Sequence, residues 1–310
     1  MNIKDIARAA QLASVLEVSG YPKPGNVHRT ADLEEATFEQ FMASSVAIGP
    51  VLMEVAERGF KAGKREIKPS DIGVGKAIKS AIEDTMKWQK NENTNLGVVM
   101  LLVPLTAAAG VTLAREGKIG MKNLRKNLPE ILKSTTYEDA LNVYDAILIA
   151  EPGGLGDLAE LDVKTEKSRK RIRGEQISLY EIMKISSEWD GISKEWVTDM
   201  RITFEFGYPL IKRLYEKTKN MNTATVQTFL EILSKYPDTF VQRIHGKKIA
   251  EKISEKAKTT VERGGMLTST GRALVAKFDE ELRKKDINPG TTADLVASSL
   301  MLAILDGLRP

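Results

Sequence analysis

Apolar residues recur along most of this chain at intervals of three and four, the spacing that gathers side chains on one face of an α-helix. Between residues 2 and 19 that face holds Ile3, Ile6, Ala10, Val15 and Leu16. Gly20 is well placed to end this first helix. The alternation of apolar and polar residues that marks a strand is almost absent. The pattern therefore predicts an all-α protein.

Capping residues, prolines and glycines set the limits of the other expected helices. Thr37 with Gln40 forms a capping-box pattern, and Asp238 is expected to cap one long helix. The expected helices span 37–59, 69 onward, 122–133, 137–150, 178–189, 193 onward with a break at 207–209, 225–236, 239–263, 269–285 and 293–308. The charged segment 164–177 is expected to be a mobile surface segment.

The segment from Leu96 to Ala114 carries no charge and is close to the length of a membrane span. It contains Pro104 and, near its end, the small residues of segment 106–110. Small residues let neighbouring helices approach closely, which favours a buried helix of a soluble bundle over a membrane helix. We therefore expect one domain over residues 1–310, a single large multi-helix bundle around a buried central helix at about 95–114.

Composition narrows the function. The chain has 310 residues, of which 42% are hydrophobic and 28% charged, as in ordinary folded proteins. Its 46 basic and 42 acidic residues are spread along the chain without a basic stripe, so no nucleic-acid partner is expected. The absence of cysteine excludes disulfides and thiolate chemistry, and two histidines are too few for a histidine-rich metal site. The charged start lacks the apolar run of a signal peptide, which predicts a cytoplasmic protein.

The segment 20–29, Gly-Tyr-Pro-Lys-Pro-Gly-Asn-Val-His-Arg, is predicted to be a stiff, non-helical loop because prolines fix φ and glycines permit turns. It carries Lys23, His28 and Arg29 on a backbone held in one shape, which suits a phosphate-rich ligand. A connector with solvated charges is the alternative.

Three more irregular segments adjoin predicted helix starts: 93–97, 238–243 and 288–294. Helix N-termini offer free N–H groups and partial positive charge, so several that converge would bind a polyphosphate. Each segment also has a simpler interpretation as a cap, with Asp238, Thr94, or Thr291 paired with Asp294.

Other conspicuous residues are given no catalytic role, and the role of the glycine loop is left open. The loop 151–157 contains three glycines but lacks the lysine and hydroxyl residue of a P-loop. The histidines are interpreted as surface residues rather than general bases, and the tryptophans as packing residues: His28, His245, Trp88, Trp189 and Trp196.

The same irregular segments carry a family resemblance. The four motifs are Pro22-Lys23-Pro24-Gly25-x-Val27-x-Arg29, Asn93-Thr94-x-x-Gly97, Asp238-Thr239 followed by Arg243, and Pro289-Gly290-x-x-Ala293-Asp294-Leu295. In order and rough spacing they resemble the triphosphoribosyl-dephospho-CoA synthase family from about residue 10 to 305. The resemblance implies an all-helical transferase that moves the 5-triphosphoribosyl group of ATP to the 2′-hydroxyl of 3′-dephospho-CoA and releases adenine, in the biosynthesis of a prosthetic group.

That reaction requires a carboxylate near C1′ of the ribose, a base for the acceptor hydroxyl, and Mg²⁺ with cationic or N–H donors for the triphosphate. At matching positions, the resemblance implies nucleotide-binding roles for Lys23, Gly25, Arg29, Thr94, Gly97, Arg243 and Gly290. It implies catalytic roles for Asp294, Asp238 and Glu17, and Mg²⁺ ligation by Asp238, Asp294 and Glu35. Which aspartate is the base and which binds metal stays open.

Several positions depart from the family pattern. The Gly-Ala-His stretch, acidic residue and methionine that follow the first block are replaced by 30–35, where only an acid, Asp32 or Glu35, survives. A His-Lys pair is replaced by Asn95-Leu96, and Gly-Gly after Arg243 by 244–246. These changes leave the acceptor open. A Mg²⁺-dependent nucleotide hydrolase and a non-catalytic nucleotide-binding protein are the alternatives, and pairing of apolar helices leaves a homodimer open.

Overall fold

A computed structural model describes residues 1–34, 36–89, 93–154 and 161–310. Within these ranges the chain forms helices and turns, with one isolated bridge between His28 and Ala31 and no sheet, which confirms the all-α prediction. The helices are α1 Ile3–Ser19, α2 Phe38–Ala47, α3 Gly49–Gly63, α4 Val74–Trp88, α5 Leu96–Glu116, α6 Met121–Lys133, α7 Tyr137–Ala150, α8 Glu166–Glu175, α9 Leu179–Ser186, α10 Gly191–Val197, α11 Tyr208–Thr218, α12 Met221–Lys235, α13 Thr239–His245, α14 Lys247–Glu262, α15 Ser269–Arg283 and α16 Gly290–Leu305.

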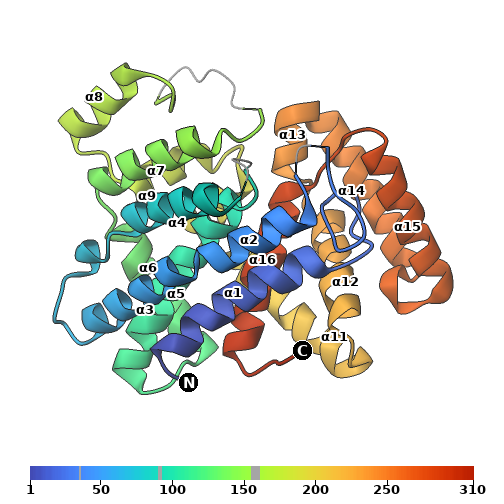
Figure 1. Ribbon diagram of the computed structural model, residues 1–310, viewed down its shortest axis with the longest axis horizontal. Coiled ribbons are helices and arrows are strands. Elements are labelled where there is room, and N and C mark those ends of the chain that lie inside the picture. Colours follow the sequence, from blue (N-terminus) through green and yellow to red (C-terminus); the bar gives the residue numbers. More distant parts are fainter. Residues whose placement is uncertain (35, 90–92, 155–160) are drawn as a thin grey trace.

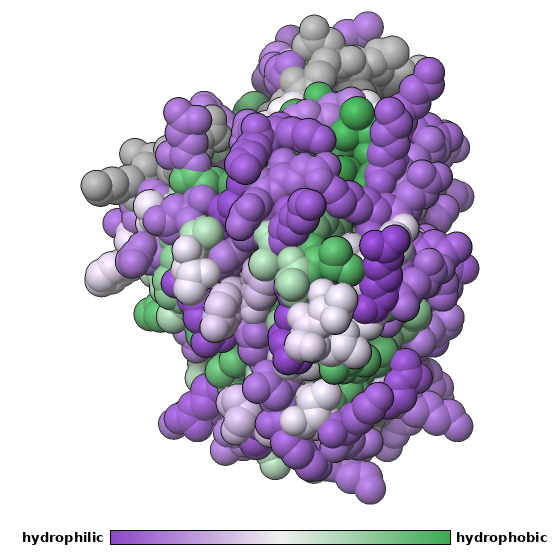
Figure 2. All heavy atoms as spheres, turned by 90° about the vertical axis from the view of Figure 1, so that its right-hand side faces the viewer, coloured by the Kyte–Doolittle hydropathy of each residue, from purple (hydrophilic) through white to green (hydrophobic). Residues whose placement is uncertain are grey.

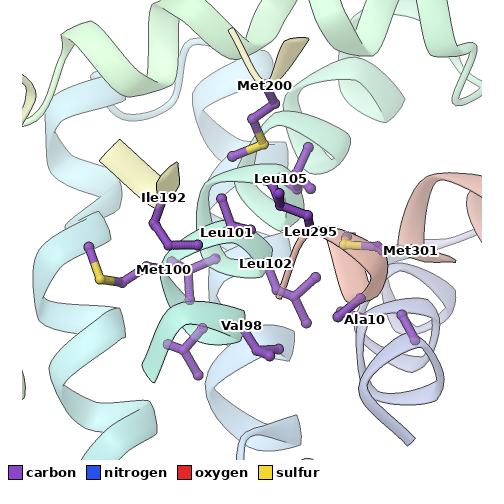
Figure 3. Close-up of a cluster of buried hydrophobic side chains, with 14 of the residues drawn as sticks. Ala10, Val98, Met100, Leu101, Leu102, Leu105, Ile192, Met200, Leu295 and Met301 are labelled. Carbon is purple, nitrogen blue, oxygen red and sulfur yellow. The ribbon is translucent and has the colours of Figure 1, made fainter. Parts of the chain in front are cut away.

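The centre of the molecule is formed by α5 and α16, two apolar helices whose side chains are buried almost throughout. Leu101 of α5 and Leu295 of α16 point into one cluster with Ala10 of α1 (Figure 3). Its length and apolar composition would let α5 cross a membrane, but 94% of its most apolar window is buried inside the fold. The prediction of a buried central helix is therefore confirmed. Burial of this surface is the main source of stability.

Two of the expected side-chain caps are present. Thr37 and Gln40 form the reciprocal capping box at the start of α2, and Asp238 caps α13 through the backbone N–H groups of Phe240 and Val241. Each of these caps satisfies N–H groups that the first turn leaves without intrahelical partners.

Two helices expected to be continuous are divided. The predicted helix 37–59 breaks at Ile48, where α3 begins with Pro50 in its first turn, because proline has no N–H to continue α2. The predicted helix 239–263 breaks at Gly246, whose φ of +87° lies outside the helical region.

One further expectation was wrong in detail. Residues Pro69–Ile72 form a separate 3-10 turn ahead of α4 rather than its start. The charged segment 164–177 is largely exposed, as expected, and contains α8, which Thr165 caps and along which Arg171 pairs with Glu175.

The loop that begins at Gly20 leaves the end of α1 and contacts α15 through Gly25 and His28. In Figure 1, α15 lies at the right-hand edge of the molecule, with α1, α2 and α16 to its left. Segment 20–29 of the loop is non-helical, as predicted. It therefore connects the central helices with a peripheral one.

Candidate active site

A cleft of about 300 Å³ opens where the start of α16 meets the starts of α5 and α10. The end of α1 contributes Glu17 and the adjoining loop contributes Asn26. Side chains from α7, α9 and α13 complete the wall. All four motif segments thus reach one cavity, the first of them through Asn26.

Asp294 is the central carboxylate of this cleft. It lies in the first turns of α16, is partly exposed to the cavity, and no described residue donates a hydrogen bond to it. The expected capping box of Thr291 with Asp294 does not form; Pro289 occupies the N-cap and the Thr291 hydroxyl contacts that of Thr239. The carboxylate therefore remains available to a ligand.

The surroundings of Asp294 disfavour its charge. Burial raises the pKa of the Asp294 carboxyl well above its usual range, and the nearby carboxylates of Glu17, Asp238 and Asp190 raise it further. Lys23 opposes the shift with a smaller effect. A carboxyl group with a strongly raised pKa in a cleft is typical of catalytic positions.

Gly97, in the first turn of α5, allows Asp294 to occupy its position. A Cβ atom at residue 97 would lie 2.1 Å from Asp294 Oδ2 and 2.5 Å from its Cγ. Such contacts are far below van der Waals separation, so any larger residue displaces the carboxylate. The predicted role of Gly97 at the site thus has a physical basis in close approach.

We expect Gly97→Ala to reduce the enzyme's turnover rate at least about tenfold, because displacement of the Asp294 carboxylate would misalign the reacting groups. The melting temperature should fall modestly, since overpacking typically costs about 1 to 3 kcal/mol and alanine regains about 1 kcal/mol as the better helix former. Gly174→Ala in α8 is the matched control, because its Cβ would meet no neighbour within 4 Å. Equal activity of both variants would show that the Asp294 position is not critical.

Glu17 and Lys23 form a buried ion pair beside the cleft. Lys23 is 0% exposed, and its Nζ donates to the Glu17 side chain and, at 3.0 Å, to the Glu17 carbonyl oxygen. Burial raises the pKa of Glu17 and lowers that of Lys23, while their mutual attraction opposes both shifts. Glu17 lines the cleft but Lys23 does not. The sequence suggested that Lys23 contacts a phosphate, but its side chain does not face the cleft.

Asp238 has a structural environment. Its Oδ1 accepts hydrogen bonds from Phe240 N at 2.9 Å and Val241 N at 3.0 Å. Its Oδ2 accepts from the backbone N and the hydroxyl of Thr292, each at 2.7 Å. The side chain is 2% exposed and outside the cleft lining, so it joins α13 to the start of α16 rather than facing a ligand.

Other residues expected at the site are distributed unevenly. Thr94, Arg243 and Gly290 line the cleft, although the Thr94 hydroxyl contacts that of Ser44 at 2.6 Å and does not cap α5. Arg29 lies outside the cleft, where its Nε donates to the Ser19 carbonyl oxygen at 2.6 Å.

Two further expectations concern Gly25 and Glu35. Gly25 has a φ of +72° and packs so closely that a Cβ would lie 2.1 Å from the Ile287 carbonyl oxygen, which makes it a packing residue. Glu35, expected to bind metal, lies outside the described residues, as do residues 155–157 of the glycine loop.

The sequence did not reveal several residues of the cleft. Asp190 and Trp189 lie at the start of α10, and Asp190 Oδ2 accepts hydrogen bonds from Ser193 N and Oγ, both at 2.8 Å. Asn26 and Asn288 face the cavity and are joined at 2.8 Å. Asn26 lies within the first motif and Asn288 directly precedes the last, which was the available signal; nothing marked the short α10.

The aromatic and histidine expectations were partly wrong. Trp196 is fully buried, as expected, and its Nε1 donates to the Met100 carbonyl oxygen. Trp88 is 73% exposed and Trp189 lines the cleft, so neither is a core residue. His28 was expected at the surface but is buried, and its Nε2 lies 2.9 Å from Asp279 Oδ2.

The described residues do not form a protein-only magnesium cage, since no group of three or more His, Cys, Asp or Glu side chains among them is placed to hold a metal ion. Of the expected ligands, Asp238 has both oxygens occupied by protein donors, which leaves Asp294. Mg²⁺ in nucleotide sites is often held by one or two carboxylates with substrate phosphates. The fit is therefore to a metal held mainly by its substrate.

This cleft is the candidate active site, because it gathers several helix starts around the Asp294 carboxylate, which accepts no hydrogen bond from a described residue. A family model described as ATP:dephospho-CoA triphosphoribosyl transferase (CitG) matches residues 3–310, so the chain belongs to this transferase family.

Individual relatives agree. The 2-(5″-triphosphoribosyl)-3′-dephosphocoenzyme-A synthase of Klebsiella pneumoniae is 22% identical over 98% of this chain and 91% of the relative. That of Escherichia fergusonii is 21% identical over the same shares. A crystal structure of an Archaeoglobus fulgidus protein ascribed to triphosphoribosyl-dephospho-CoA synthase matches with 29% identity and a TM-score of 0.64, covering 86% of this chain and all of that one.

Proposed function

We propose that this protein transfers the 5-triphosphoribosyl group of ATP to the 2′-hydroxyl of 3′-dephospho-CoA and releases adenine. Family membership over residues 3–310 supports the reaction. The observation that carries the assignment to this cleft is the Asp294 carboxylate, which faces the cavity opposite Gly97 without a hydrogen bond from any described residue.

In this reaction the bond between C1′ of the ribose and adenine breaks, and adenine leaves with the bonding electrons. A bond from C1′ to the acceptor oxygen forms, and the hydroxyl proton is transferred overall to adenine. The transition state carries positive charge near C1′, which nearby carboxylates stabilise. Glu17, Asp190 and Asp294 all line the cleft and can supply that negative potential.

Within this proposal, Asp294 acts at C1′ and on the acceptor proton, whereas Glu17 is held by Lys23 and acts through its charge. Among the described residues that line the cleft, Arg243 is the one lysine or arginine, so we assign it to the triphosphate. Its guanidinium lies 5.1 Å from the Phe240 ring centroid. Trp189 offers an apolar surface to adenine or to the acceptor.

Mg²⁺ enters this proposal as an ion bound by the triphosphate, whose charge it neutralises. Of the residues expected to bind metal, Asp294 is the described one that lines the cleft and could add a carboxylate ligand to it. The protein groups described above do not depend on that ligation for their positions, because Asp238 and the Glu17–Lys23 pair are held by protein hydrogen bonds.

The test is to incubate the purified protein with ATP and Mg²⁺, with and without 3′-dephospho-CoA, and to measure free adenine by liquid chromatography. We expect adenine only when the acceptor is present. Adenine without acceptor would indicate hydrolysis at C1′, and ADP or AMP would indicate a phosphoanhydride hydrolase. Binding of ATP without any product would contradict the proposal for this acceptor and favour a nucleotide-binding role.

A further inference from the structure

The loop segment 20–29 borders the cleft on one side and is hydrogen-bonded to α15 on the other. Asp279 of this helix accepts three hydrogen bonds: from Gly25 N at 2.9 Å, from His28 Nε2 at 2.9 Å and from Arg283 Nε at 3.0 Å. Burial alone would raise the pKa of Asp279, but the His28 hydrogen bond and the Arg283 charge lower it overall. Two of these three donors belong to the loop, so one carboxylate fixes both ends of the 25–28 segment.

Arg283, one turn further along α15, completes the attachment. Its Nη1 donates to the Asp32 carbonyl oxygen at 2.7 Å, and its Nη2 donates to the carbonyl oxygens of Asn26 and, at 3.5 Å, Ala31. A planar guanidinium can satisfy several carbonyl oxygens at fixed angles, which an ammonium cannot reproduce. One side chain therefore holds the loop backbone at Asn26 and again at residues 31 and 32.

The same loop residues extend to the cleft on their other side. Asn26 is 4% exposed, lines the cleft, and its Nδ2 donates to Asn288 Oδ1 at 2.8 Å. Asn288 directly precedes the segment that begins α16 and carries Asp294. The backbone of Asn26 is thus held by Arg283 while its side chain contacts the wall beside the proposed catalytic carboxylate.

We propose that Asp279 and Arg283 are positioning residues, which keep Asn26 and the Asn26–Asn288 contact in the geometry that the transfer reaction requires. The inference rests on the function proposed above. Neither residue lines the cleft, so both act through the loop rather than by touching a substrate. In a packed site, small displacements of residues that align substrates reduce rates strongly.

The structure also provides a way to test this role chemically. Arg283 and Asp279 line a second, open hollow of about 900 Å³ on the α15 side of the loop, together with Arg29 and Arg272. The face that carries α15 is largely hydrophilic, with hydrophobic residues in its recesses (Figure 2). A guanidinium ion from solvent can therefore reach the position that the Arg283 side chain leaves when it is truncated.

The experiment compares Arg283→Ala with Arg272→Ala, a control on the same helix. Arg272 borders the same hollow, and its one hydrogen bond to a described residue goes to the Met266 carbonyl oxygen at 3.3 Å. In Arg283→Ala, we expect hydrogen exchange of the 24–32 segment to accelerate at least about tenfold. The kcat/KM for adenine release should fall about tenfold to a hundredfold. Added guanidinium chloride at about 50 mM, far below denaturing concentrations, should restore part of both.

Arg272→Ala should change neither quantity and should not respond to guanidinium. If Arg283→Ala does not fold, Arg283→Lys replaces it, with faster exchange and reduced kcat/KM expected because an ammonium cannot reach all the carbonyl oxygens. Unchanged exchange, or faster exchange with unchanged kcat/KM, would overturn the positioning role. Absence of adenine with the unmodified protein would instead contradict the proposed function, and the exchange measurement would still report whether α15 holds the loop.

Discussion

Asp294→Asn is expected to lower acceptor-dependent adenine release at least about a hundredfold while the protein becomes more stable at neutral pH. The loss of rate follows because an amide neither carries the negative charge that stabilises C1′ nor accepts the acceptor proton. Asparagine has nearly the same shape, so the packing against Gly97 should persist. Steady-state kinetics with circular dichroism as a check on folding measures the first effect.

The gain in stability follows from the pKa of Asp294. The folded-state pKa lies well above the value of about 4 in an unfolded chain. The unfolded state therefore releases this proton at lower pH, and ionisation favours unfolding increasingly as the pH rises from about 4 to the folded pKa. An uncharged amide at this position would remove that destabilising contribution. The melting temperature of Asp294→Asn should exceed that of the unmodified protein near pH 8, and the difference should shrink as the pH falls toward 4.

Asp286→Asn is the matched control, since this exposed aspartate lies near the start of α16 but outside the cleft. It should keep both the rate and the melting temperature. If Asp294→Asn retained more than about a tenth of the rate, the carboxylate would not be catalytic. A fall in its melting temperature near pH 8 would show that the carboxylate stabilises the fold instead.

The sequence predicted the parts of the fold that depend on local interactions. The capping box at Thr37, the cap at Asp238 and the buried helix α5 follow from residues a few positions apart, and each is present. Breaks such as Gly246 were missed because helix periodicity continues across them. A single residue can change the direction of a helix without altering the apolar pattern.

The candidate site was predictable to the level of segments but not of side-chain roles. Motif spacing brought Gly97, Arg243 and Asp294 to one cleft, as the structure places them. It could not show that Asp238 has all its acceptor sites occupied by protein donors, because two of the four donors belong to Thr292, 54 residues away. The burial of Lys23 could not be predicted from the sequence either, since a lysine between two prolines suggests an exposed loop.

Lys23→Ala is expected to produce the largest loss of stability of any single substitution considered. Removal of the ammonium would leave the Glu17 carboxylate, 4% exposed, without its ion-pair partner. Breaking a buried ion pair from one side typically costs about 3 to 5 kcal/mol, because the remaining charge must stay buried or take up a proton. Chemical denaturation monitored by circular dichroism would measure the decrease in the free energy of unfolding.

A double-mutant cycle distinguishes this ion-pair role from a phosphate contact. Lys23→Met combined with Glu17→Gln removes both charges, and we expect it to recover much of the stability that Lys23→Met alone loses, because no uncompensated charge remains. If Lys23 instead bound the triphosphate, its replacement would raise the KM for ATP with little change in stability. The Glu17 substitution would then give no recovery. The buried position of Nζ favours the first result, in which Lys23 serves the reaction by fixing the charge and orientation of Glu17.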